Sequence, residues 1–140
     1  MRHPAFALGS LLVILASPLP SLGAHPKDQL LDRFATQAKQ QNPGFAGFSA
    51  QRGEQLYRQQ FTGGNADTPS CTSCHRDSPR ASGQTRAGKP IEPLALSLNP
   101  QRLTDPEKVA KWFLRNCKGV LGRECTPIEK GDFIQFMASQ

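Results

Sequence analysis

The segment Cys71-Thr72-Ser73-Cys74-His75 constrains this chain more than any other feature. Its C-x-x-C-H spacing is that of a covalent haem attachment site. On one helical turn, residues three and four positions apart face the same side. Both thiols can therefore bond to the vinyl groups of one porphyrin, and the histidine can bind its iron. The motif predicts one haem c, attached through Cys71 and Cys74, with His75 as the proximal iron ligand.

Two other uses of paired cysteines compete with this interpretation. A thiol–disulfide redox pair accompanies a βαβ pattern, which the chain lacks. A structural zinc site needs about four Cys or His ligands. Cys117 and Cys125 would complete such a set, but their spacing matches no common zinc module. The haem interpretation is therefore favoured.

The first 24 residues have the pattern of an export signal. A short basic start precedes an apolar run over residues 5–16, and two prolines then separate this run from small residues. The run is shorter than the ~20 residues that a membrane-spanning helix needs. A buried N-terminal helix is the alternative interpretation. We expect cleavage after Gly23 or Ala24, so that the mature chain is periplasmic, where disulfides form.

A chain of 140 residues has room for one small domain in addition to such a signal. Its 37% hydrophobic content, with twelve Gly and twelve Pro, predicts a thin core and much irregular structure. A bulky cofactor would complete a core of this kind. We expect a signal peptide over residues 1–24 and one cytochrome c domain over residues 25–140, with the haem-binding core at about 49–140.

Helical periodicity marks two segments before the motif and none directly after it. Residues 28–41 and 49–60 place apolar side chains at helical spacing, and Ser49 fits the N-cap of the second segment. Residues 76–100 are rich in Pro, Gly, Ser and basic side chains. We expect a long ordered loop there, with one helical turn near residues 94–98 and no strand.

Two capping boxes mark the helices of the last third. Thr104 with Glu107 begins a helix that we expect to run from Asp105 to about Cys117. This helix should bury three apolar residues, Val109, Trp112 and Phe113. A second box, made by Thr126 and Glu129 with Pro127 at the first helical position, begins a helix that ends near Ser139. The pattern predicts an all-α fold: a small class I-like monohaem cytochrome c with about four helices and long loops around one haem.

The residue on the other side of the iron is less constrained. His25 lies at the new N-terminus, where chains fray, which makes it a poor candidate. Met137 would make an ordinary electron carrier, but it follows Phe133 by four positions, where core packing explains it. Asn116 precedes Cys117 at the expected end of its helix, where closing that helix explains it. The residues alone leave Met137 and Asn116 open.

Cys117 and Cys125 are the two cysteines outside the motif. In an exported chain, a disulfide between them is the simplest assignment. Two free thiols are the alternative.

From about Gly53 onward, the sequence resembles the Sphaeroides haem protein family, oxygen-binding cytochromes c that share the DUF1924 domain. The matching stretches are GEQLY (53–57), the C-x-x-C-H motif (71–75), TRAGKPIEP (85–93), KWFLRNC (111–117) and GRECT (122–126). The combination of RNC with GREC is far more specific than C-x-x-C-H.

The resemblance implies an Asn on the distal iron position that moves away when a small ligand binds. This Asn precedes the first cysteine of a disulfide, so the role falls on Asn116 and the bond on Cys117–Cys125. The chemistry agrees, because an amide oxygen is a hard, neutral ligand that suits ferric iron. Ferrous iron prefers softer ligands such as O₂, CO or NO. The resemblance also implies a dihaem cytochrome c and a membrane b-type cytochrome as redox partners.

We therefore expect an exported cytochrome c, not an enzyme, that transfers electrons and binds a diatomic ligand (O₂, NO or CO). A plain electron carrier with Met137 on the iron is one alternative. A terminal oxygen or nitric oxide-converting haem enzyme is another, although no distal constellation can be assigned. Arg115, beside Asn116, fits either a second donor or a solvated position. The formal net charge of +6 favours an acidic redox partner, and an exported haem protein gives no support to nucleic-acid binding.

Overall fold

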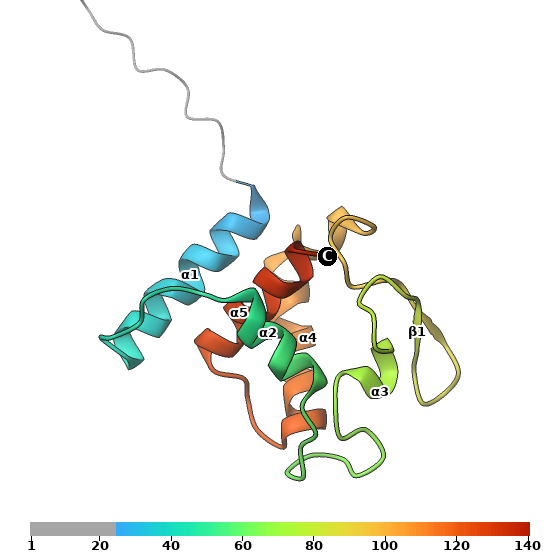
Figure 1. Ribbon diagram of the computed structural model, residues 1–140. Helices are drawn as coiled ribbons and strands as arrows, with labels where there is room; N and C mark the ends of the chain where they lie inside the picture. The colour runs from blue at the N-terminus through green and yellow to red at the C-terminus, as the bar shows by residue number, and fades with distance from the viewer. Residues whose placement is uncertain (1–24) are drawn as a thin grey trace, which may run out of the picture.

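The computed structural model describes residues 25–140, and the expected export signal lies outside the described residues. The described chain is mainly helical (Figure 1), with α1 (Pro26–Gln41), α2 (Ala50–Arg58), α3 (Thr72–His75), β1 (Gly83–Gln84), β2 (Pro90–Ile91), the 3₁₀ helix η1 (Pro100–Leu103), α4 (Pro106–Leu121) and α5 (Pro127–Ala138). None of the described helices is long and apolar enough to cross a membrane. The predicted helical architecture is confirmed.

The loop after the motif is more regular than the sequence predicts. β1 and β2 pair antiparallel, with Gly83 opposite Ile91, so the expectation that the loop has no strand is wrong. The connecting turn includes Gly88 at φ 76°, a conformation that glycine adopts without steric cost. The predicted helical turn is present, since the backbone N–H groups of Leu98 and Asn99 donate to the carbonyl of Ala95 at 3.1 and 3.0 Å.

Side-chain caps begin α2 and α5. The Ser49 hydroxyl accepts the backbone N–H of Arg52 at 3.3 Å, as predicted for the start of α2. The capping box of α5 is also confirmed. The Thr126 hydroxyl accepts the Glu129 N–H at 3.2 Å, and the Glu129 carboxylate accepts the Thr126 N–H at 2.7 Å.

α4 differs from the prediction at both ends. Its N-cap is Asp105, whose carboxylate accepts the Lys108 N–H at 3.0 Å, because the preceding turn η1 uses Thr104 as its own C-cap. The helix continues past Cys117 and stops at Gly122, where φ is 75°. Asn116 therefore lies inside α4 and does not close it. Trp112 is 45% exposed, so the expectation that α4 buries it is wrong.

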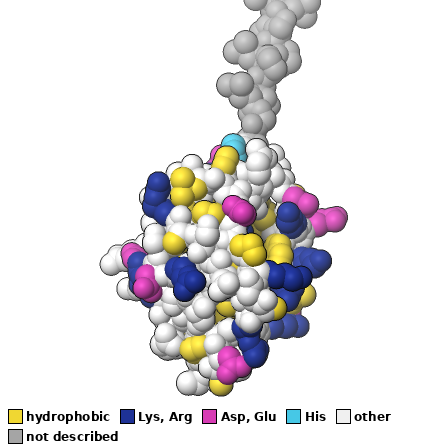
Figure 2. All heavy atoms as spheres, turned by 90° about the vertical axis from the view of Figure 1, so that its right-hand side faces the viewer, with side chains coloured by type: hydrophobic (Ala, Val, Ile, Leu, Met, Phe, Trp, Pro, Cys, Tyr) yellow, Lys and Arg dark blue, Asp and Glu magenta, His cyan; other side chains and the backbone are white. Residues whose placement is uncertain are grey.

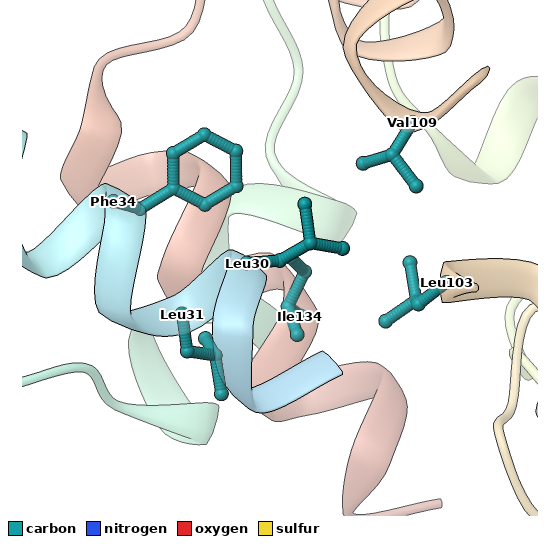
Figure 3. Packing of buried hydrophobic residues seen from close by; sticks show 6 residues of the cluster. All are labelled: Leu30, Leu31, Phe34, Leu103, Val109 and Ile134. Atoms are coloured by element: carbon teal, nitrogen blue, oxygen red, sulfur yellow. The ribbon is translucent and has the colours of Figure 1, made fainter. Parts of the chain in front are cut away.

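A hydrophobic cluster joins the N-terminal helix to the C-terminal half. Leu30, Leu31 and Phe34 of α1 turn toward Ile134 of α5, with Leu103 and Val109 on the far side (Figure 3). Phe34 also meets the ring of Phe113 edge-on at 6.0 Å. Residues 26–41 are thus part of the domain core.

α2 and α5 cross at van der Waals contact. A Cβ atom on Gly53 would lie 2.0 Å from the Asp132 carbonyl oxygen, so this position admits only glycine without movement of a backbone. The Asp132 side chain is 4% exposed and accepts the Ser49 N–H at 2.7 Å and the Arg52 guanidinium at 2.7 and 2.8 Å. This buried carboxylate ties the start of α2 to α5.

Candidate haem site

The C-x-x-C-H segment forms one helical turn, α3, on the side of the molecule opposite α1 (Figure 1). The N–H groups of Cys74 and His75 both donate to the Cys71 carbonyl, at 3.3 and 3.0 Å. Because positions i, i+3 and i+4 share one side of a helical turn, both thiols and the imidazole leave the turn on one side. Cys71 and Cys74 are free thiols, as covalent attachment of a haem requires.

Hydroxyl groups fix the start of this turn. Ser70 is 2% exposed, and its hydroxyl lies within hydrogen-bond distance of the Thr72 hydroxyl. The Ser70 N–H donates to the Ser73 hydroxyl at 3.2 Å. These short-range bonds hold the chain at the point where it enters the motif.

The surroundings keep His75 and Cys71 uncharged. Burial, with a smaller contribution from the Arg102 cation, lowers the pKa of His75 to about 4. The imidazole is therefore neutral at pH 7, the form that binds metals. Burial raises the pKa of the Cys71 thiol to about 11. Neither group carries a charge that the apolar ring of a porphyrin would have to bury.

The loop after the motif folds back over it. A Cβ atom on Gly83 would lie 2.2 Å from the Cys74 carbonyl oxygen. The N–H groups of Leu94 and Ala95 donate to the carbonyl of Pro79 at 2.8 and 3.0 Å. The Arg102 guanidinium closes the far end by donating to the carbonyls of Glu92 and Pro93 at 2.7 and 3.0 Å. Residues 79–102 thus form a backbone-bonded cover beside His75.

Asn116 lies on α4 next to the disulfide. Cys117 and Cys125 are bonded, with 5.5 Å between their Cα atoms, so the predicted disulfide is confirmed. The loop before the motif docks on the same helix end, where the Asn65 N–H donates to the Gly119 carbonyl at 2.7 Å. A Cβ atom on Gly64 would meet the Val120 carbonyl oxygen at 2.3 Å. The Asn116 side chain is exposed, on the part of α4 that both connections hold.

The other two candidate iron ligands, Met137 and His25, have structural roles of their own. Met137 is 1% exposed and belongs to the buried cluster of Tyr57, Leu94 and Phe136, which is the core position that its spacing predicts. His25 is the N-cap of α1, and its ring nitrogen accepts the Lys27 N–H at 3.3 Å.

The Arg115 side chain lies against the exposed Trp112. Its guanidinium lies over the Trp112 ring, 5.6 Å from the ring centre. A cation on an exposed aromatic face is a common surface arrangement. The solvated alternative for Arg115 is therefore the better description.

The residues present fit a covalently attached haem. The disulfide removes Cys117 and Cys125 from any metal set that would include the motif. Among residues 25–140, no three His, Cys, Asp or Glu side chains gather as ligands for an ion. What remains at α3 is two free thiols and one neutral imidazole on a single turn. This donor set suits a porphyrin and does not suit zinc.

Two residues at the site were not identified from the sequence. The Tyr57 hydroxyl lies 3.0 Å from the His75 carbonyl oxygen and 2.6 Å from that of Arg76. Arg76 itself has φ 64°. A signal for Tyr57 existed, since it is the only tyrosine of the chain and follows Gly53 by one helical turn. No signal in the sequence indicates the conformation of Arg76.

This helical fold with its C-x-x-C-H turn defines the protein as a small c-type cytochrome. The sequence matches, over residues 43–137, the family described as domain of unknown function DUF1924. It is 52% identical to the cytochrome c-type protein SHP of Cereibacter sphaeroides over 91 residues, 65% of this chain and 70% of the relative. It is 31% identical to cytochrome c'' of Methylophilus methylotrophus over 114 residues, 81% and 79% of the two chains.

Solved structures agree with the sequence matches. The oxidised form of SHP, described as an oxygen-binding cytochrome c, superposes with a TM-score of 0.75 at 45% identity, covering 81% of this chain and 96% of the other. Oxidised cytochrome c'' superposes with a TM-score of 0.72 at 30% identity, covering 82% and 94%. The chain belongs to the DUF1924 family of SHP-type cytochromes and carries one covalently attached haem c.

Proposed function

We propose that this chain is an exported monohaem cytochrome c that carries electrons and reversibly binds a diatomic gas. Cys71 and Cys74 hold the haem, His75 is the proximal ligand, and Asn116 is a displaceable ligand on the other side. The haem supplies a one-electron redox change and, once its sixth ligand leaves, an open coordination position.

The position of Asn116 carries this proposal. It lies five residues before the end of α4, so it has no capping role there. Asn is unfavourable inside helices because its side chain competes for backbone hydrogen bonds. Its side chain is exposed, and no hydrogen bond to it is seen among the described residues. A ligand role explains a residue that local structure does not require.

The surroundings of Asn116 suit a ligand that leaves and returns. Its neighbour Cys117 is bonded to Cys125, and the Asn65 N–H is bonded to the Gly119 carbonyl one turn further on. The backbone is therefore restrained on the carboxyl side. Asn116 would then leave the iron by rotation of its side chain, while the helix stays in place. The oxygen binding described for SHP supports the same function here.

A plain electron carrier with Met137 on the iron has less support. Its side chain is enclosed by Tyr57, Leu94 and Phe136, and its carbonyl accepts the Leu96 N–H at 3.0 Å. Bringing the sulfur to an iron would empty that cluster. An oxygen-reducing or nitric oxide-converting enzyme is the other alternative, and a steady-state turnover assay with O₂ or NO distinguishes it from the carrier we propose.

Visible spectra with and without CO test the proposal. The reduced wild-type protein should bind CO. Asn116→Ala should open the oxidised iron to water or added anions and raise ligand on-rates, because no protein ligand has to be displaced. Met137→Leu is the control, since it nearly conserves volume and should cost less than ~1.5 kcal/mol with an unchanged haem spectrum. A sulfur-to-iron band that Met137→Leu removes, or reduced protein that ignores CO, would contradict the proposal.

The same proposal includes an acidic redox partner outside the cytoplasm. Lys and Arg side chains are spread over the face that carries α3 and β1 (Figure 2). The segment after the motif has four exposed cations, Arg76, Arg80, Arg86 and Lys89. Such a face attracts an acidic protein, and we propose a dihaem cytochrome c and a membrane b-type cytochrome. Mass spectrometry of the periplasmic fraction, showing a chain that lacks residues 1–24, tests the export.

A further inference from the structure

The chain leaves the haem motif through an unfavourable conformation. Arg76, the residue after His75, has φ 64° and ψ 176°. It is the only non-glycine residue with positive φ in the part of the chain that the structure describes. That region is open almost exclusively to glycine, and other residues stay in it only where their surroundings hold them.

The Tyr57 hydroxyl supplies such a restraint. Its oxygen lies 2.6 Å from the Arg76 carbonyl oxygen and 3.0 Å from that of His75. One O–H group is therefore shared between the carbonyl of the residue with the unusual φ angle and the carbonyl of the residue before it. The ring is fully buried and lies against Phe136 at 5.6 Å. The hydroxyl therefore connects the α2–α5 core directly to the turn that carries His75.

The opposite side of the turn is also in contact with the chain. A Cβ atom on Gly83 would lie 2.2 Å from the Cys74 carbonyl oxygen and 3.1 Å from the His75 Cα atom. The backbone of His75 is thus enclosed between β1 and Tyr57. Of these two contacts, only the one from Tyr57 reaches the carbonyls of His75 and Arg76.

We infer that Tyr57 is a positioning residue for His75: by holding the His75 and Arg76 carbonyls, its hydroxyl keeps the chain in the left-handed turn and so fixes the imidazole on the iron. The inference rests on the role of His75 in the proposed function. With the proximal imidazole fixed, structural changes that accompany ligand exchange would occur only on the Asn116 side of the haem.

The test is a cycle of variants in the holoprotein: Tyr57→Phe, Arg76→Gly and the double variant. Phe keeps the buried ring and removes the hydroxyl. Gly adopts the Arg76 conformation without a side-chain clash. The measurement is the set of paramagnetically shifted NMR resonances of the haem methyl groups and the His75 ring in the oxidised protein. Tyr57→Phe should shift these resonances or add a second set, Arg76→Gly should leave them in place, and the double variant should recover the wild-type pattern.

Asp132→Asn is the matched control, because it weakens the same α2–α5 pair through Arg52 without touching the turn. It should lower the denaturation midpoint and leave the shifted resonances unchanged. The inference is overturned by an unchanged Tyr57→Phe spectrum, by a double variant as perturbed as Tyr57→Phe, or by an equal perturbation in Asp132→Asn. These spectra are read on oxidised protein, so failure of the reduced protein to bind CO counts against the proposed function alone.

Discussion

The α2–α5 crossing and the segment 59–104 are held together in different ways. At the crossing, Gly53 contacts the Asp132 backbone, and the Asp132 side chain receives donors from α2. In the segment, the regular elements are a single helical turn, a hairpin of two two-residue strands and a 3₁₀ helix. Backbone hydrogen bonds, such as those to the Pro79 carbonyl, connect its parts.

This difference indicates which part needs the cofactor. Ordering the backbone costs about 1–2 kcal/mol per residue, and burial of apolar area must offset that cost. The helices supply most residues of two large clusters, whereas within 59–104 the buried hydrophobic residues are Leu94, Ala95 and Leu103, of which Leu94 and Leu103 join those clusters. The covalent haem would supply the missing apolar surface to the segment. The helical crossing should depend on it less.

The largest expected effect is loss of attachment. Cys71→Ala combined with Cys74→Ala should abolish covalent haem and lead to loss of the native fold, beginning with the segment 59–104. Hydrogen exchange measured by mass spectrometry would detect this as unprotected amides in 59–104, with slower exchange remaining in α2 and α5. Equal protection of both regions in a haem-free chain would contradict the idea that segment 59–104 depends more on the haem than the α2–α5 crossing does.

The crossing should be sensitive to a single methyl group. Gly53→Ala forces a Cβ atom against the Asp132 carbonyl, so we expect a loss of about 3 kcal/mol in the free energy of unfolding. Gly119→Ala, inside α4, is the control, because a Cβ atom there would meet no other part of the described chain within 4 Å. Ala is the better helix former, and this control should gain up to ~1 kcal/mol. Denaturant titration of both holoproteins checks the pair.

The disulfide should matter less than the crossing. Cys117→Ser with Cys125→Ser removes a short covalent loop, and loop-closure entropy predicts a loss of about 2.6 kcal/mol. The change is at the carboxyl side of Asn116, so ligand on-rates should change as well. A loss of stability with unchanged CO kinetics would show that the bond stabilises the helices without restraining Asn116.

The smallest effect is expected in acid. Burial opposes ionisation of Glu129, but hydrogen bonds from Arg123 and from the Thr126 backbone outweigh it and lower its pKa. The stabilisation is therefore complete above the unfolded value of about 4.3 and is lost as the pH falls through the lower folded pKa. Glu129→Gln should flatten this part of the stability curve, measured as denaturation midpoint against pH. Identical curves for the two proteins would exclude the contribution.

Short-range signals predicted much of the fold. Thr126 and Glu129 predicted the start of α5 because both partners of a capping box lie within one turn. The same signal at Thr104 was wrong, since η1 uses that residue and Asp105 caps α4 instead. Trp112 was expected in the core from its apolar character, which does not say which side of a helix has a partner.

The sequence by itself determined the haem motif, the disulfide pair and four of the helices. Each of these depends on residues a few positions apart or, for the disulfide, on one pair of cysteines. The tertiary structure decided the interior position of Asn116, the enclosure of Met137, and the bond from Tyr57 to a turn 18 positions away. The position of Asn116 depends on how far α4 continues past Cys117, and the other two features depend on which buried groups meet when α2 crosses α5. That meeting is a property of the whole packed chain, because no local pattern encodes it.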